Sequence, residues 1–184
     1  MNIANKLTIL RIIMVPVFMA FLMLDVSNPI YVGIALVLFV VASLTDTLDG
    51  YIARHYNMIT DFGKFMDPLA DKMLTTAAFL CLMHQGRASA VAVMLILARE
   101  FIVSGIRLVA AGKGNVIAAS IWGKMKTVFQ MVAIIAAIIL LFPICPPATA
   151  ALITHILVWR SAVVSVISGA DYVIKNFDII KEAK

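Results

Sequence analysis

Four aspartates stand at helical spacing in one short stretch of the sequence, DTLDGYIARHYNMITDFGKFMDPLAD, which covers residues 46–71. Asp46 and Asp49 are three residues apart, and Asp67 and Asp71 are four apart, so each pair falls on one face of a helix. Two such helices facing each other would aim four carboxylates at one small volume, where their charges repel. Divalent metal resolves that repulsion, and oxygen ligands without His or Cys on these faces favour Mg²⁺ or Mn²⁺ over zinc. We therefore expect the four aspartates to hold two metal ions, an arrangement that grips phosphoryl groups.

Small and basic residues share the same helix faces. Gly50, Ala53 and Gly63 remove side-chain bulk, so a phosphorylated ligand can approach the backbone. Arg54 offers a planar guanidinium that can donate two parallel hydrogen bonds to phosphate. Two other interpretations stay open: single acidic residues at a helix end are most often solvated, and intramembrane carboxylates also form cation pathways in transporters. Transport alone leaves the small residues and the arginine unexplained.

The composition places these residues in a membrane protein. Hydrophobic residues make up 63% of the 184 residues, charged residues 14%, and the mean hydropathy is +1.04. A bilayer core about 30 Å thick is crossed by roughly 20 mostly apolar helical residues. We expect an all-α, polytopic integral membrane protein with six transmembrane helices in a single domain, residues 1–184. The apolar segments, separated by short breaks, are Leu7 to Leu24, Ile30 to Ala53, Pro68 to Met83, Ala88 to Ala111, Val116 to Phe142 and Ala148 to Val173.

Basic residues gather at one set of segment ends, which predicts the orientation of the bundle. Both termini and the carboxylates are expected to face the cytoplasm, because the opposite breaks carry only Arg87. The formal net charge of +5 fits a rim that meets anionic lipid. Binding of nucleic acid explains this positive charge less well, since the basic residues lie at membrane boundaries. The basic residues on the expected cytoplasmic side are Lys6, Arg11, Arg54, Lys64, Lys72, Arg107, Lys113, Lys124, Lys126, Lys175, Lys181 and Lys184.

The aspartate stretch fits a complete pattern, Asp-x2-Asp-Gly-x2-Ala-Arg-x8-Gly-x3-Asp-x3-Asp, and resembles the signature of the CDP-alcohol phosphatidyltransferase family. The resemblance implies a six-helix membrane enzyme, usually a homodimer, with its active site open to the cytoplasmic interface and CDP-diacylglycerol as donor. It implies that Asp46 and Asp67 bridge both metals and that Asp49 completes the first site. Asp71 would touch the second ion and act as the general base.

The same resemblance implies which residues bind the donor. Family members tend to carry Pro-Asn-x-x-Thr-x-x-Arg near the N-terminus, and ANKLTILR keeps Asn5, Thr8 and Arg11 but has Ala4 where proline is common. The residues implied to bind CDP-diacylglycerol are Asn5, Thr8, Gly50, Ala53, Arg54, Thr60 and Gly63.

A second polar block, AREFIVSGIRLVAAGKGNVIAASIWGKMKT at residues 98–127, indicates an anionic acceptor. Arg107, Lys124 and Lys126 outnumber the nearby acids and predict a pocket for a phosphate. Arg99 and Glu100 have an alternative interpretation, in which they only neutralise charge within the bundle. The block resembles the matching region of bacterial phosphatidylglycerophosphate synthases, which implies sn-glycerol 3-phosphate as acceptor and the bacterial cell membrane as location. Inositol phosphate would fit the charge equally, and a cardiolipin synthase reaction is a further alternative.

Overall fold

The structure, a computed structural model, is helical throughout the part of the chain that it describes. That part comprises residues 3–55, 61–112, 120–177 and 181; at residues 3–4, 46–55, 61–65 and 67–68 the backbone alone is described. No strand occurs among these residues, which confirms the predicted all-α class. The six helices in these ranges are α1 (Ile3–Leu24), α2 (Pro29–His55), α3 (Asp61–His84), α4 (Ala90–Gly112), α5 (Ile121–Ile139) and α6 (Pro147–Lys175).

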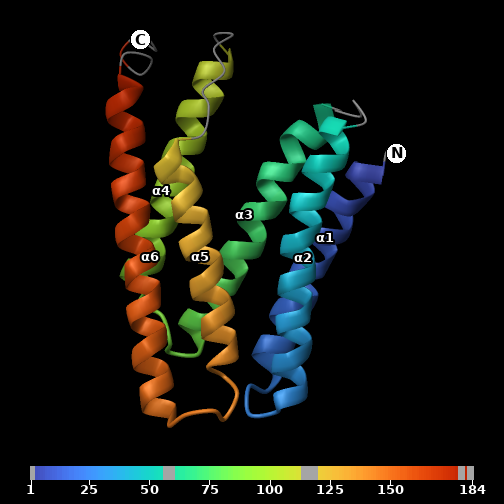
Figure 1. Cartoon of the computed structure of the whole chain (residues 1–184), viewed down its shortest axis with the longest axis vertical. Coiled ribbons are helices and arrows are strands. Elements are labelled where there is room, and N and C mark those ends of the chain that lie inside the picture. Colours follow the sequence, from blue (N-terminus) through green and yellow to red (C-terminus); the bar gives the residue numbers. More distant parts are fainter. Residues whose placement is uncertain (1–2, 56–60, 113–119, 178–180, 182–184) are drawn as a thin grey trace.

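The helices run up and down as a bundle, and both ends of the chain lie at the same end of it (Figure 1). The short connections 25–28, 85–89 and 140–146 lie at the opposite end. Helix α1 packs mainly against α2 and α3, whereas α6 packs mainly against α4 and α5. Because α3 also contacts α4 and α5, it joins the two groups of helices.

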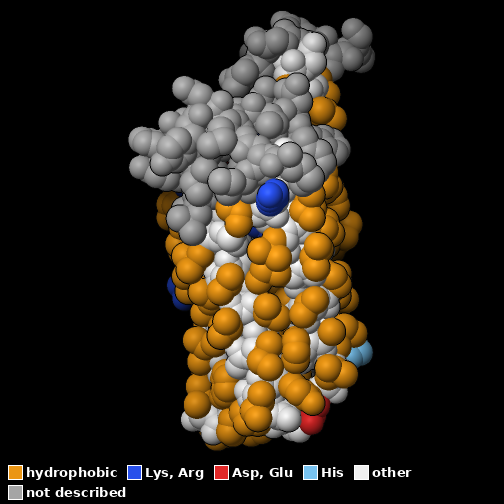
Figure 2. All heavy atoms as spheres, turned by 90° about the vertical axis from the view of Figure 1, so that its right-hand side faces the viewer, with side chains coloured by type: hydrophobic (Ala, Val, Ile, Leu, Met, Phe, Trp, Pro, Cys, Tyr) orange, Lys and Arg blue, Asp and Glu red, His pale blue; other side chains and the backbone are white. Residues whose placement is uncertain are grey.

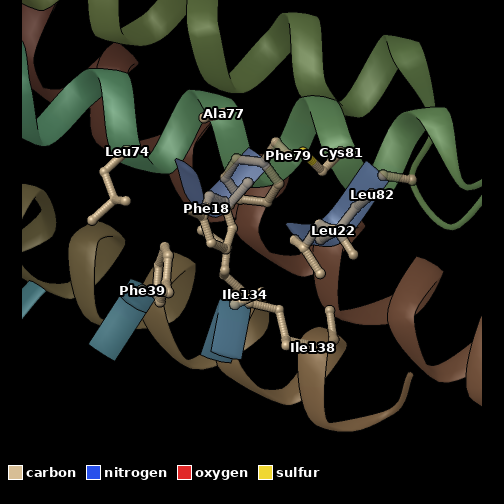
Figure 3. Close-up of a cluster of buried hydrophobic side chains, with 14 of the residues drawn as sticks. Phe18, Leu22, Phe39, Leu74, Ala77, Phe79, Cys81, Leu82, Ile134 and Ile138 are labelled. Carbon is tan, nitrogen blue, oxygen red and sulfur yellow. The ribbon is translucent and has the colours of Figure 1, made fainter. Parts of the chain in front are cut away.

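Large apolar side chains from α1, α2, α3 and α5 fill the centre of the bundle (Figure 3). Phe18 and Phe39 are fully buried, and their ring centroids lie 5.7 Å apart in a tilted arrangement that aromatic pairs favour. Ala77 is buried in the same cluster, and a residue this small lets neighbouring helices approach closely. Leu74 belongs to this core and follows Asp71 by three residues, so the core fixes the position of Asp71 on α3.

The outside of the bundle is apolar over most of its length, as a surface in contact with lipid requires. Figure 2 shows hydrophobic side chains over most of the face below the grey residues, with few charged side chains among them. Exposed Phe101, Leu108 and Val128 illustrate this surface. Among the described residues, three helices are long and apolar enough to cross a membrane, Asn5–Leu24, Ile121–Ile139 and Pro147–Lys175, and α2 has a shorter apolar part, Pro29–Thr45.

Two of the tight connections are held by specific hydrogen bonds. The Asp25 carboxylate accepts from the hydroxyl of Ser27 at 2.6 Å and from its amide at 2.9 Å, and these bonds lower the pKa of Asp25. In the next connection Gly86 has a φ of 69°, a left-handed conformation that favours glycine. Arg87 Nη1 donates to the carbonyl of Leu140 at 3.1 Å and so ties the α3–α4 turn to the end of α5. Both breaks are turns, as the sequence predicts.

Helix α3 begins at Asp61, seven residues before the predicted apolar segment that starts at Pro68. It therefore includes Gly63 and Asp67, as the helical spacing of the aspartates predicts. The bounds of α1, α2, α4 and α6 differ from the predicted apolar segments by only a few residues.

Helix α5 is shorter at both ends than the apolar segment predicted for it, Val116 to Phe142. The helix begins at Ile121 rather than at Val116, because the Ser120 side chain caps it by accepting from a backbone amide of the first turn; residues 116–119 lie outside the described part of the chain. It ends at Ile139 rather than at Phe142, since a residue that precedes proline is sterically biased away from helix.

Candidate active site

The predicted metal ligands lie in α2 and α3, near the connection between these helices. Helix α2 continues to His55 and α3 starts at Asp61, so the helical spacing expected for both aspartate pairs is confirmed. Asp71 is half-buried. Thr60 lies outside the described residues altogether, and several predicted ligands and donor-binding residues have side chains outside them: Asp46, Asp49, Gly50, Ala53, Arg54, Gly63 and Asp67.

The chemistry of the four aspartates fits Mg²⁺ or Mn²⁺. Carboxylates are hard oxygen donors, and these ions prefer such ligands. Within the described part of the chain, no group of three or more His, Cys, Asp or Glu side chains could hold a metal ion. Since Asp71 is the one predicted ligand whose side chain is described, the metal site stays a prediction.

A cavity of about 250 Å³ opens beside Asp71, where α3, α4 and α5 meet. It brings together Asp71, Arg107, Lys124 and Lys126, which the sequence predicts from two separate blocks. Five basic side chains and two carboxylates line it, so its charge favours an anionic ligand. The lining residues are Asp71 and Lys72 of α3; Arg99, Glu100, Val103, Ser104 and Arg107 of α4; and Gly123, Lys124, Lys126 and Thr127 of α5.

Glu100 is the centre of an ion-pair network in this cavity. It accepts from the buried Lys126 of α5, and its Oε1 lies 3.4 Å from Nη1 of Arg99 on the same helix. Arg99 Nη2 also donates to the hydroxyl of Ser168 on α6 at 2.7 Å. Charges removed from water need such partners, so these contacts agree with the neutralisation interpretation of Arg99 and Glu100. Both side chains nevertheless line the cavity.

Arg107 reaches the cavity from α4 and is held by α6. Its Nε donates to the hydroxyl of Tyr172 at 3.2 Å, and its guanidinium carbon lies 5.7 Å from the centroid of that ring. Tyr172 is buried, whereas Arg107 is exposed. Lys124 is exposed as well. Since tyrosine is a neutral partner, the positive charge of Arg107 is not cancelled by this contact, unlike that of Lys126.

Lys72 and Ser104 also line the cavity, although the sequence did not single them out for a site. Lys72 Nζ donates to Ser104 Oγ between α3 and α4, and Ser104 Oγ donates to the carbonyl oxygen of Glu100 at 2.6 Å. The sequence feature that could have indicated Lys72 is its place directly after Asp71.

Arg99 could have been assigned to the cavity from its distance to Arg107. The two are eight residues apart, an offset that returns to the same face of a helix.

Helix α1 carries three buried polar side chains at three-residue intervals, Asn5, Thr8 and Arg11. They occupy one face of a helix that packs against α2 and α3. Buried polar groups are normally hydrogen-bonded, and each of these three makes a polar contact. The contacts with donor predicted for Asn5 and Thr8 remain predictions.

Comparison with known proteins identifies the family. The family model described as CDP-alcohol phosphatidyltransferase matches residues 1–167. The chain belongs to this family. The matched region of this CDP-alcohol phosphatidyltransferase contains all four aspartates and the whole lining of the cavity, and it confirms the resemblance seen in the sequence. The family generally depends on divalent metal, in agreement with the oxygen donors on α2 and α3.

Relatives of this CDP-alcohol phosphatidyltransferase occur in several bacteria. A Bacillus subtilis protein named CDP-diacylglycerol–glycerol-3-phosphate 3-phosphatidyltransferase is 40% identical over 98% of this chain and 97% of its own length. A protein of the same name from Rickettsia typhi is 37% identical over 93% of this chain and 94% of its own length. A probable phosphatidylglycerophosphate synthase of Mycobacterium tuberculosis is 39% identical over 94% of this chain and 80% of its own length.

Proposed function

We propose that this protein transfers the phosphatidyl group from CDP-diacylglycerol to sn-glycerol 3-phosphate, giving phosphatidylglycerophosphate and CMP in phospholipid biosynthesis. The observation that carries the proposal is the basic cavity beside Asp71, because a phosphorylated acceptor needs cations next to the reacting group. The names of relatives that are about 40% identical over nearly the whole chain support the same reaction. Acceptors without a phosphate, such as serine, would not require this surplus of positive charge.

The reaction is a phosphoryl transfer with a simple balance of bonds. A hydroxyl oxygen of the acceptor forms a bond to the phosphorus that bears the diacylglycerol, and the bond from that phosphorus to the CMP oxygen breaks. Asp71 takes the hydroxyl proton, a role that suits a half-buried carboxylate at the edge of the acceptor cavity. Its place on α3 next to the basic side chains supports this assignment.

Four aspartates would hold two divalent ions, Mg²⁺ or Mn²⁺, with Asp46 and Asp67 shared between them and Asp49 and Asp71 each binding one. When bound, such ions stabilise the negative charge on the transferred phosphate and on CMP. The cytidine diphosphate part of the donor would be bound by the residues that the family signature implies: Asn5, Thr8, Gly50, Ala53, Arg54, Thr60 and Gly63.

In the acceptor pocket, Arg107 and Lys124 would bind the phosphate of glycerol 3-phosphate, with Lys126 adding positive charge from the side. This division follows from their contacts: Lys126 is buried against Glu100, whereas Arg107 and Lys124 are exposed. A guanidinium can also grip phosphate through two parallel hydrogen bonds.

The proposed setting is a bacterial cell membrane that the single domain, residues 1–184, crosses six times as a homodimer. Both termini and the active site would face the cytoplasm. The shared end of the two termini and the basic residues there support this orientation (Figure 1). The homodimer rests on the family resemblance alone.

An acceptor panel tests the proposal. Purified protein with CDP-diacylglycerol should release CMP fastest with sn-glycerol 3-phosphate, and more slowly with glycerol, serine, inositol phosphate or phosphatidylglycerol. Preference for unphosphorylated glycerol would remove the reason for the basic cavity. A cation transporter, by contrast, would carry metal into vesicles without any nucleotide and would release no CMP.

A further inference from the structure

The side chain of Arg99 on α4 lies against α6 at Gly169, where only glycine leaves enough room. A Cβ atom added to Gly169 would lie 2.9 Å from Cγ of Arg99 and 3.7 Å from its Cβ. The first distance is shorter than real Cβ contacts allow, so a larger residue at position 169 must displace the Arg99 stem or the helix. The clash is with the base of the side chain, where a change of rotamer moves everything beyond it.

The far end of Arg99 makes two polar contacts and lies close to Gly123 of α5. Its Nη2 donates to Ser168 at 2.7 Å, and its Nη1 lies 3.4 Å from Glu100. On the α5 side, a Cβ atom at Gly123 would lie 3.6 Å from Nη2, which is ordinary van der Waals contact. The side chain is 10% exposed, and its Nε is buried without a hydrogen-bond partner among the described residues. Any shift of the stem would therefore break contacts that hold the guanidinium at the cavity.

We infer that Gly169 is a positioning residue for the acceptor cavity: its missing side chain lets Arg99 pass along α6 and present its guanidinium beside Glu100. Through Arg99, Gly169 then sets the affinity for the acceptor's phosphate without touching it. The inference rests on the proposed function, because it takes the cavity to be the acceptor pocket.

Gly169→Ala tests the inference, because a positioning role should change the acceptor KM and leave the donor KM and kcat much less affected. The KM for sn-glycerol 3-phosphate should rise at least about 10-fold, the lower range for loss of a hydrogen bond to a charged group. The KM for CDP-diacylglycerol should stay near its original value, and kcat should change much less than the acceptor KM. The matched control is Gly105→Ala on α4, where a Cβ atom meets nothing within 4 Å; this variant should keep both KM values.

A double-mutant cycle separates positioning from general damage to the α4–α6 contact. Arg99→Ala should raise the acceptor KM by itself, and adding Gly169→Ala in that background should change the KM no further, because the clashing Cγ is gone. If Gly169→Ala prevents folding, Arg99→Ala should restore expression and the melting temperature to those of the Arg99→Ala variant. Additive effects on KM and on melting temperature would overturn the inference.

The two proposals fail in different ways. A normal acceptor KM in Gly169→Ala, together with a raised KM in Arg107→Ala, rejects the role of Gly169 and leaves the acceptor pocket intact. A raised donor KM in both Arg99→Ala and Arg107→Ala rejects the acceptor pocket. In that case the melting temperatures of the cycle still decide whether Gly169 acts through Arg99.

Discussion

Arg107 donates from Nε to the hydroxyl of Tyr172 at 3.2 Å, and its guanidinium lies against the same ring. Tyr172 is buried on α6, so it fixes one edge of an arginine that is otherwise exposed at the cavity. A neutral aromatic partner holds a cation without cancelling its charge. This arrangement suits a side chain that must keep its charge for an anionic ligand.

Replacing Arg107 by Ala should therefore raise the KM for sn-glycerol 3-phosphate and leave the KM for CDP-diacylglycerol nearly unchanged. A lost charge-assisted hydrogen bond costs about 1.5 to 3 kcal/mol, which corresponds to roughly 10- to 150-fold in KM. Steady-state kinetics with each substrate varied in turn measure both values.

Two further variants refine this test. Arg107→Lys should recover only part of the loss, because an ammonium cannot reproduce the planar fork of a guanidinium. Tyr172→Phe keeps the ring and removes the hydroxyl, so it should raise the acceptor KM less than Arg107→Ala does. If Arg107→Ala weakens donor binding instead, Arg107 lies at the nucleotide and the acceptor assignment is wrong.

Asp71→Asn separates binding from chemistry. The amide keeps the shape of the side chain but cannot take the hydroxyl proton, so CMP release should fall at least about 100-fold. Binding of CDP-diacylglycerol, measured by calorimetry in detergent, should survive. Near-normal turnover in this variant would show that another residue acts as the general base.

Removal of divalent metal should abolish activity. Excess EDTA should stop CMP release, and Mg²⁺ or Mn²⁺ added beyond the chelator should restore it, since four carboxylates provide hard oxygen ligands. The effect of Zn²⁺ at matched free concentration provides the control for selectivity. Full turnover in excess EDTA contradicts a role for the aspartates as metal ligands.

The ion pair between Glu100 and Lys126 should contribute to stability as a unit. Glu100→Gln leaves Lys126 buried without its carboxylate, and breaking a buried pair in this way costs about 3 to 5 kcal/mol of unfolding free energy. The double variant Glu100→Gln/Lys126→Met removes both charges and should lose less than Glu100→Gln alone. Reversible unfolding in detergent compares the two, with Lys124→Met as an exposed control; a loss in the double variant at least as large as that of Glu100→Gln alone would contradict the prediction that the pair acts as a unit.

The helices were predictable where their ends coincide with the ends of apolar runs. The turn at Gly86 interrupts hydropathy and also needs a residue that tolerates positive φ, so two signals agree there. At the start of α3 hydropathy gives no signal, because Asp61 and its neighbours are polar, and the spacing of the aspartates indicates the helix instead. Hydropathy reports the membrane-facing length of a helix, and not the length that its backbone hydrogen bonds sustain.

The site was predictable only as far as one helix determines it. The offset between Asp67 and Asp71 places both on one face whatever the packing, and a surplus of basic residues signals an anionic ligand. That Lys126 turns toward Glu100, and that Arg99 lies against Gly169, depend on how α4 meets α5 and α6. Contacts of this kind are set by the distance between two helices, which no spacing along the sequence encodes.

The two cysteines provide a built-in test of the proposed orientation. Cys145 is partly exposed in the turn between α5 and α6, at the end of the bundle opposite the termini, whereas Cys81 is buried in the core. A membrane-impermeant maleimide added to intact spheroplasts should therefore label Cys145, and Cys145→Ser should abolish labelling. In the Cys145→Ser background, Lys175→Cys at the end of α6 should react only after the membrane is permeabilised, because that end faces the cytoplasm in the proposed topology. Labelling of Lys175→Cys from outside would show that the bundle has the opposite orientation, with the acceptor cavity facing away from the cytoplasm.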